Sequence, residues 1–268
     1  MVSDAADILK ETAMIKCTAG KISSRIFQFN EANILGPYVD SYLYIGEEKA
    51  VVIDALETAE NLYESVGNIT DLPLEVLLTH GHRDHAGKGL HQFFEAGIPV
   101  WMREEDIPLY RTSAKEEPHF LPLKEGQIFD LGDRKLETVF CAGHTPGSAV
   151  FFDRENGYLF SGDSVGSGHF WMQLKHSLPL HEFRTNLQNL IDLTENTSDL
   201  RIYPGHRNQS PVQLNRQYLL DEAVLIDRIL SGKETAEKKT MRLDREDIVF
   251  CEGHEGLLIN MCYDPENL

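Results

Sequence analysis

Four side chains that can bind a metal ion lie within the six positions 80–85, namely His80, His82, Asp84 and His85. The mainly apolar residues 74–78, Leu-Glu-Val-Leu-Leu, precede them and predict a short buried strand, whereas the residues from 86 to 96 predict a helix. Four titratable groups beside a buried strand are costly unless a compensating charge accompanies them. The sequence therefore predicts a loop between a strand and a helix that binds a divalent cation.

The spacing of these side chains favours two ions over one. In an extended backbone, residues two apart point to the same side, so His80 and His82 can converge on one ion. Asp84 and His85 lie at the turn into the expected helix and face another direction. Because a catalytic zinc ion has about three protein ligands and an open position, each site needs further ligands from elsewhere in the chain.

Three other predicted strands end in a glycine next to a histidine or aspartate, and these strand ends supply His144, Asp163 and His206. A fourth strand, Ala50–Ile53, ends at Asp54 without the glycine. A single histidine at a strand end is usually a surface or hydrogen-bonded residue, so none of these positions identifies a site alone. Together with the cluster at 80–85, they predict a metal centre.

With these residues in place, the chain resembles the metallo-β-lactamase-fold superfamily, and within it the hydroxyacylglutathione hydrolase-like branch. Residues 80–85, His-Gly-His-Arg-Asp-His, are similar to the family's His-x-His-x-Asp-His motif. The resemblance extends from the hairpin at Ser41 to His206. It implies an α/β fold, a four-layer αββα sandwich in which two mixed β-sheets are flanked by helices.

The resemblance also implies a role for each candidate residue. The first ion would be held by His80, His82 and His144, the second by Asp84, His85 and His206, and Asp163 would bridge them. Asp54 falls where the family has an acidic residue that orients a ligand histidine rather than binding metal. Asp84 would in addition be the catalytic residue that orients the nucleophile and carries its proton.

Two divalent ions, zinc by expectation with iron or manganese as alternatives, can share a water and lower its pKa towards neutrality. The bridging hydroxide would attack a carbonyl carbon, and we interpret Ser148 and Ser164 as turn and capping hydroxyls rather than as serine nucleophiles. We therefore predict a hydrolase of a small carboxylic ester, thioester or lactone. The alternatives are a mononuclear iron persulfide dioxygenase-like enzyme, a phosphodiesterase or nuclease of the same fold, and a metal-binding protein without turnover.

Two segments are longer than a connection requires, residues 103–127 and 165–180. The second contains His169, Phe170, Trp171 and Met172, which either wall an apolar substrate pocket or belong to the core. The glutathione-specific hydrolases of the superfamily carry a large helical substrate domain that we do not expect here, which weakens a glutathione thioester as substrate. Gly166 stands where the lactonases of this fold have a tyrosine, which argues against that activity.

Composition limits the classes of partner. The 268 residues carry a formal net charge of −18, which argues against nucleic acid, because binding to phosphate backbones depends on clustered lysine and arginine. The four cysteines form no Cys-x-x-Cys pair, the N-terminus predicts no signal peptide, and the apolar runs are too short to cross a membrane. We expect a cytoplasmic protein with a small-molecule substrate, no membrane association, and no pattern that decides whether it is a homo-oligomer.

The candidate ligands are spread from residue 54 to residue 206 without a linker, so we expect one domain over residues 1–268. Residues 1–20 predict a tail or short helix, and helices are expected at Thr58–Val66 and His181–Leu193. In the C-terminal part, 210–268, Ser210 and Pro211 predict the start of a helix that ends near Leu230. A closing hairpin is expected from strands at 248–251 and 257–262.

Overall fold

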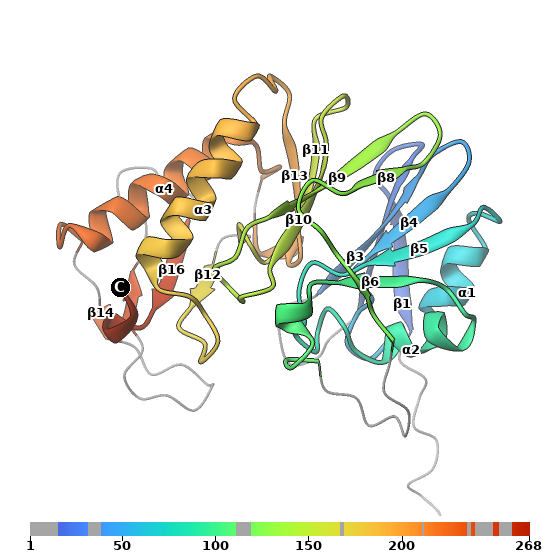
Figure 1. Ribbon diagram of the computed structural model, residues 1–268, viewed down its shortest axis with the longest axis horizontal. Coiled ribbons are helices and arrows are strands. Elements are labelled where there is room, and N and C mark those ends of the chain that lie inside the picture. The colour runs from blue at the N-terminus through green and yellow to red at the C-terminus, as the bar shows by residue number, and fades with distance from the viewer. Residues whose placement is uncertain are drawn as a thin grey trace, which may run out of the picture.

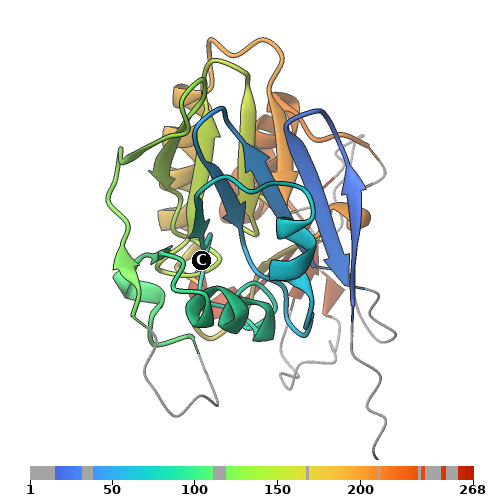
Figure 2. The same cartoon turned by 90° about the vertical axis from the view of Figure 1, so that its right-hand side faces the viewer.

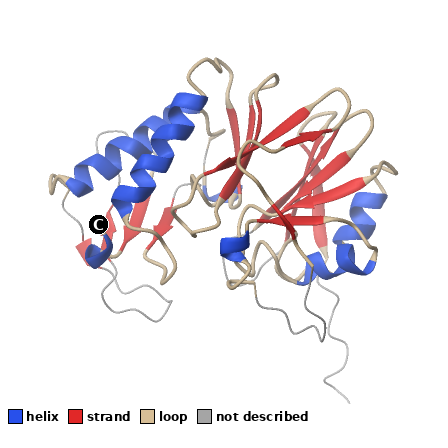
Figure 3. Ribbon diagram, in the orientation of Figure 1, coloured by secondary structure: helices blue, strands red, loops and turns tan. Residues whose placement is uncertain are grey.

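The computed structural model describes residues 16–31, 39–110, 119–166, 169–210, 212–234, 237–238, 249–251 and 259–268. Two mixed β-sheets lie face to face, with a pair of helices on the outer side of each (Figures 1 and 3). The expected four-layer αββα sandwich is therefore confirmed. Most of the segment expected to form a tail or short helix, residues 1–15, lies outside the described residues.

The first sheet has seven strands in chain order. They are β1 (Cys17–Lys21), β2 (Ile26–Glu31), β3 (Asp40–Ile45), β4 (Ala50–Ile53), β5 (Leu74–Leu77), β6 (Val100–Met102) and β7 (Leu121–Pro122). The strands from β1 to β4 pair antiparallel and those from β4 to β7 pair parallel, which confirms the predicted β3–β4 hairpin. Helices α1 (Leu62–Gly67) and α2 (Lys88–Glu95) make the two crossovers next to β5 and cover the outer face of this sheet (Figure 2).

Helix α1 begins four residues later than expected, at Leu62 rather than Thr58. The reason is a set of three long-range hydrogen bonds. The carboxylate of Glu31, at the end of β2, accepts from the backbone N–H groups of Thr58 and Ala59 and from the Thr58 hydroxyl. These groups are therefore bound to a neighbouring strand instead of opening the helix.

The second sheet has five strands in the order β13 (Arg201–Pro204), β11 (Tyr158–Gly162), β10 (Ala149–Asp153), β9 (Lys135–Phe140) and β8 (Ile128–Asp130). Only the β11–β13 pair is parallel among these. Its outer face is covered by α3 (Leu180–Leu193) and α4 (Arg216–Leu230), which pack against each other. None of the helices in the described ranges is both long and apolar enough to span a membrane.

Both faces of each central strand are buried, and the pleat distributes side chains between two cores. In the first sheet, Tyr42 and Ile53 contribute to the core between the sheets, whereas Leu43 and Val52 pack on the side of α1 and α2. In β10 of the second sheet, Phe151 contributes to the core between the sheets while its neighbours pack on the side of α3 and α4. Strands buried on both faces have continuous apolar sequences rather than alternating ones.

Helix α4 begins at Arg216, so the predicted start at Ser210 and Pro211 is wrong. Asn215 is the N-cap, and its side chain accepts a hydrogen bond from the backbone N–H of Gln217. The Ser210 hydroxyl instead donates to the carbonyl of Val212, and Pro211 lies outside the described residues. Leu214 forms an isolated bridge with Ile202 of β13, which holds the connection extended up to the cap.

A third, smaller sheet corrects the prediction of a long loop at 165–180. Strand β12 (His169–Met172) lies in that segment and pairs parallel with β16 (Asn260–Tyr263). Strand β15 (Val249–Cys251) pairs antiparallel with β16 and with β14 (Glu237–Lys238), so a C-terminal hairpin is present with shifted bounds. The other long segment, 103–127, contains a short 3-10 helix (Glu104–Asp106) and β7, with 111–118 outside the described residues.

Candidate metal centre

The seven candidate ligands meet at one end of the two sheets, each in a loop that follows a strand. The loop of residues 80–85 follows β5 of the first sheet, whereas His144, Asp163 and His206 follow β9, β11 and β13 of the second. His80, His85, His144, Asp163 and His206 are buried, whereas His82 and Asp84 are partly exposed, Asp84 with a side-chain exposure of 38%. The structure therefore brings together all the residues that were predicted to bind metal.

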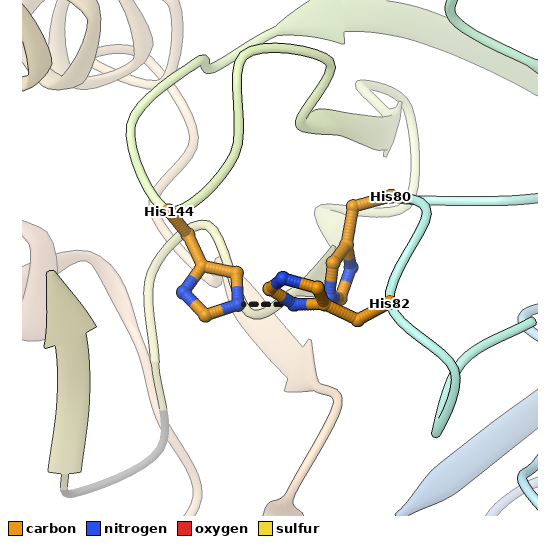
Figure 4. Close-up of side chains that lie close together, drawn as sticks. All are labelled: His80, His82 and His144. Atoms are coloured by element: carbon orange, nitrogen blue, oxygen red, sulfur yellow. Dashed lines mark hydrogen bonds between the residues drawn. The ribbon is translucent and has the colours of Figure 1, made fainter. Parts of the chain in front are cut away.

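The first group consists of His80, His82 and His144, whose ligand atoms all lie within 4.8 Å of one another. Figure 4 shows His80 and His82 on one loop, facing His144 on another. The Nε2 atom of His144 lies 3.0 Å from Nδ1 of His82. Because Nδ1 of His144 donates to the carbonyl of Trp171 at 2.7 Å, its Nε2 is the bare nitrogen and is free to bind a cation.

The second group consists of His85, Asp163 and His206, again within 4.8 Å. Asp163 Oδ1 lies 3.4 Å from His85 Nε2, and its Oδ2 lies 3.3 Å from His206 Nε2. Asp163 Oδ2 is also 3.6 Å from His144 Nε2, so this carboxylate faces both groups. Asp84 Oδ2 lies 3.5 Å from His206 Nε2, and Asp84 forms a third grouping with His80 and His85.

The chemistry of these side chains fits a divalent metal ion. His80 is buried, and its Nε2 atom has no hydrogen-bond partner among the described residues. Its Nδ1 atom lies 3.0 Å from the hydroxyl of Thr79. A buried polar atom without a partner requires an explanation, and a bound cation provides one. Imidazole nitrogens and carboxylate oxygens suit zinc, iron or manganese.

Burial controls the charge of His80 and His82. It lowers the pKa of His80 well below the usual histidine value, and the neighbouring histidines His85 and His82 add to that effect. Burial likewise lowers the pKa of His82 to about 3. Both imidazoles are therefore neutral at physiological pH, which is the state in which histidine binds metal.

The second group attracts positive charge. Burial acts to lower the pKa of His85 and His206, but the neighbouring carboxylates, Asp163 foremost, together outweigh it and raise both, that of His206 to about 10. Burial acts to raise the pKa of Asp163, yet His206 and His85 hold it well below the usual range. In the metal-free protein the carboxylate is thus ionised and the histidines carry protons, at the place where a cation would otherwise balance the charge.

Asp54 lies immediately after β4 and connects two parts of the ligand loop. Its Oδ2 accepts from Nδ1 of His85 at 2.8 Å, and its Oδ1 accepts from the backbone N–H of Thr79 at 2.8 Å. Asp54 has a φ of 59°, in the left-handed region that few residues other than glycine adopt. Such strain persists only where the surroundings enforce it, and it often accompanies functional sites.

Asp106 was missed by the sequence analysis. This buried carboxylate accepts hydrogen bonds from the backbone N–H of Gly81 at 2.9 Å, the hydroxyl of Thr145 at 2.6 Å and the backbone N–H of Gly147 at 2.6 Å. It thereby joins the loop of His80 and His82 to the loop of His144. A Cβ atom added to Gly81 would lie 2.4 Å from the backbone carbonyl oxygen of Asp106, and one added to Gly147 would lie 2.5 Å from the Cγ of Asp106. The two glycines are the local signal of this close approach, but they do not identify the partner.

Asp40 and the carbonyl of Trp171 were also missed. Asp40, at the start of β3, accepts from the backbone N–H of Arg207 at 2.7 Å and from the side chain of Gln28 at 2.6 Å. It anchors the residue that follows His206, and burial raises its pKa to about 6. Nothing in the local sequence around residue 40 indicates this contact.

The residues predicted to wall an aromatic pocket after Asp163 lie in strand β12 rather than in a loop. Phe170 and Met172 are buried in the core next to α3 and α4, which favours the core alternative for these two residues. Trp171 is half-buried, and the side chain of His169 is outside the described part of the structure. A substrate contact for Trp171 or His169 stays a prediction.

A cleft with a volume of about 710 Å³ opens beside the candidate metal centre. His82, from the first group of ligands, lies in its wall, together with residues of α2 and of the segment that follows the 3-10 helix at 104–106. This is within the usual range for small-molecule sites, about 300–1,000 Å³. The cleft therefore gives a small molecule room next to the predicted ligands.

Two proteins are similar to this chain in sequence. The chain is 28% identical over 212 residues to the acyl-coenzyme A thioesterase MBLAC2 of Gallus gallus, covering 67% of this chain and 73% of that protein. It is 28% identical over 187 residues to the hydroxyacylglutathione hydrolase GloC of Haemophilus influenzae, covering 64% and 86%.

Solved structures have the same fold. A metallo-beta-lactamase from Pontibacter korlensis superposes with a TM-score of 0.64 at 21% identity, covering 79% of this chain and 99% of that one. The crystal structure of TTHA1623 in a di-iron-bound form has a TM-score of 0.56 at 28% identity, covering 69% and 93%. The family model described as the metallo-beta-lactamase superfamily matches residues 35–206, a range that contains all seven candidate ligands. The chain belongs to the metallo-beta-lactamase superfamily.

Proposed function

We propose that this protein is a dinuclear metal-dependent hydrolase of thioesters, acting on a small-molecule substrate. The observation that carries the proposal is the position of Asp163, whose carboxylate oxygens lie 3.3–3.6 Å from histidine nitrogens of both groups. One ion would be held by His80, His82 and His144, and the other by Asp84, His85 and His206, with Asp163 shared between them. The relatives named as an acyl-coenzyme A thioesterase and a hydroxyacylglutathione hydrolase support a thioester over an oxygen ester or a lactone.

Two bound divalent ions would supply acidified water as the nucleophile and a Lewis acid for the carbonyl oxygen of the substrate. The residues around them act by orientation. Asp54 fixes the ring of His85 by accepting from its Nδ1, and the carbonyl of Trp171 fixes the ring of His144 in the same way. Each of these hydrogen bonds leaves Nε2 as the atom that faces the centre.

Asp84 is the candidate for proton transfer. Its side chain is 38% exposed, in contrast to the buried His85, and its Oδ2 lies 3.5 Å from Nε2 of His206. The histidines hold its pKa well below the usual range against the effect of burial, so that it is an ionised proton acceptor. From this position it would take a proton from the attacking water and return it to the leaving thiolate.

Metal analysis combined with a substrate panel tests the proposal. We expect about two metal ions per chain and faster hydrolysis of thioesters than of matched carboxylic esters, lactones or bis(p-nitrophenyl) phosphate. Replacing Asp84 with Ala should lower kcat by about 10²-fold or more, because the variant lacks the group that transfers the proton. A single tightly bound iron with oxygen consumption in the presence of a persulfide would contradict the proposal, as would a preference for the phosphodiester.

A further inference from the structure

The cleft of about 710 Å³ beside His82 has a lining that differs in charge from the rest of the molecule. The chain has a formal net charge of −18, yet the cleft is lined by Arg83, Lys88, His91 and His176, with Glu57 as the acidic residue among the ten that form it. A local reversal of charge inside a concave surface focuses the electrostatic field and attracts anions.

Three separate segments bring these basic groups together. Arg83 belongs to the predicted metal-binding loop, Lys88 and His91 are three residues apart on one side of α2, and His176 comes from the connection between β12 and α3. Residues that are distant in the chain therefore converge on one cavity. Pro108 and Leu109 add an apolar part to the same wall.

The existing ion pairs of the two permanent cations are loose. Arg83 Nε lies 3.4 Å from Glu57 Oε1, and its side chain is 71% exposed. Lys88 Nζ lies 4.0 Å from Glu60 Oε1, and its side chain is 65% exposed. Exposed pairs of this kind contribute little to stability, so both side chains can turn to a ligand with little loss.

The position of the cleft determines which part of a substrate it can hold. His82 lies both in the cleft wall and in the first group of candidate ligands, 3.0 Å from His144. A carbonyl group held at the centre would therefore have one of its two substituents in this cleft. An uncharged acyl chain forms no ion pairs with basic side chains, whereas a thiol carrier with anionic groups complements both the basic groups and the apolar wall of the cleft.

We infer that this cleft binds the thiol half of the thioester through anionic groups, phosphate or carboxylate, that contact Arg83 and Lys88. The inference rests on the proposed thioester hydrolysis and adds the class of leaving group to it. Phosphates occur on coenzyme A, whose thiol ends a flexible chain, and carboxylates occur on glutathione, whose thiol is on the side chain of its central cysteine. The uncharged thiol pantetheine has such a chain without the anions.

Binding of the free thiols tests the cleft without any turnover. Calorimetry on the metal-loaded protein should show tighter binding of coenzyme A or glutathione than of pantetheine, with an advantage that decreases as salt is added. Lys88→Ala should weaken binding of the preferred anionic thiol about two- to fivefold, and the double variant Arg83→Ala/Lys88→Ala should weaken it further. The carrier that shows the effect identifies the anion as phosphate or carboxylate.

Lys135→Ala is the matched control. Lys135 is 59% exposed and forms a similarly loose pair with Asp130 at 3.7 Å, but it lies on β9 and does not line the cleft. Its replacement should leave the affinity for every thiol unchanged. Equal affinity for all three thiols, or equal effects of Lys88→Ala and Lys135→Ala, would overturn the inference.

Turnover separates this inference from the proposed function. With one acyl group on each thiol, the ratio of kcat/KM for the anionic thioester to that for the pantetheine thioester should fall in Lys88→Ala by the factor seen in binding. If the native protein and Lys88→Ala both hydrolyse all three thioesters at equal rates, the cleft assignment is overturned and the proposed function stays intact. No hydrolysis of any thioester, together with salt-sensitive binding that Lys88→Ala weakens, would refute the function and retain the anion site.

Discussion

Glu222 shows how a single residue can act against the stability of the fold. It lies on α4 with its carboxyl group fully buried, and neither oxygen has a hydrogen-bond partner among the described residues. Leu219 and Ile226, on the same side of the helix, belong to the apolar core. Burial raises the pKa of Glu222 well above the usual glutamate value, so the folded protein holds it protonated.

The raised pKa predicts a loss of stability as the pH increases. Above about pH 4.5 the unfolded chain releases the proton while the folded protein keeps it, so the free energy of unfolding falls by about 1.4 kcal/mol per pH unit until the folded carboxyl titrates. Glu222→Leu removes this dependence. Urea unfolding of both proteins at pH 5, 6, 7 and 8 should show a stabilisation by the substitution that grows with pH, and a difference that is constant across this range would contradict the prediction.

Helix α4 begins six residues later than the local sequence predicts, at Arg216 rather than Ser210. Ser210 followed by Pro211 is a common start of a helix, but the chain stays extended to Leu214 because that residue bridges to Ile202 of β13. The first turn is then capped by Asn215, whose side chain accepts from Gln217. The start of this element is decided by a neighbouring strand rather than by its own sequence.

This assignment of the cap predicts different effects for two similar substitutions. Asn215→Ala removes the acceptor for the Gln217 N–H and should lower the free energy of unfolding by about 1 kcal/mol. Ser210→Ala removes a hydroxyl that is bound to the Val212 carbonyl outside the helix and should change it by less than about 0.5 kcal/mol. Equilibrium denaturation measures the free energy of unfolding of both variants. A larger loss for Ser210→Ala than for Asn215→Ala would contradict the assignment of Asn215 as the cap.

At the scale of the whole molecule, the candidate centre joins the two sheets. The ligand loop at 80–85 follows the first sheet, and the other three ligands follow the second. Asp106 adds a metal-independent connection, because it follows β6 of the first sheet and accepts from Thr145 and Gly147 after β9 of the second. The relative position of the two halves of the site therefore depends on this carboxylate.

Asp106→Ala should lower both stability and metal content. It leaves two backbone N–H groups and one hydroxyl buried without their acceptor, which should reduce the free energy of unfolding by about 3 kcal/mol. Denaturation measures this loss, and elemental analysis should show less metal per chain. Asp106→Asn, which keeps one acceptor oxygen, should lie between the variant and the native protein, and Asp71→Ala, at an exposed position, is the control. Native metal content in a destabilised Asp106→Ala would show that the residue supports the fold alone.

Much of the fold and of the candidate site could be predicted from sequence because the signals are local. The strands around Val52 and Val150 are runs of apolar residues, and the one around Val76 is interrupted only by Glu75. Asp54 directly follows the strand around Val52, and the ligands at 80–85 lie within a few positions of the strand around Val76. The family resemblance depends on the same short motif at 80–85. For this reason the two mixed sheets and their flanking helices were predicted correctly, whereas the extent of the domain stays a prediction.

The sequence by itself determined which side chains are available at the strand ends and that the strand before the ligand loop is buried. Only the tertiary structure decided the pairing of β12 with β16, the hydrogen bonds of Asp106 and the lining of the cleft. The physical reason is the range of the interactions. The apolar pattern of a strand and the spacing of ligands involve residues a few positions apart. His169 pairs with Asn260, and Lys88 lines the same cavity as His176, only because distant segments pack together, and no local pattern shows which of them meet.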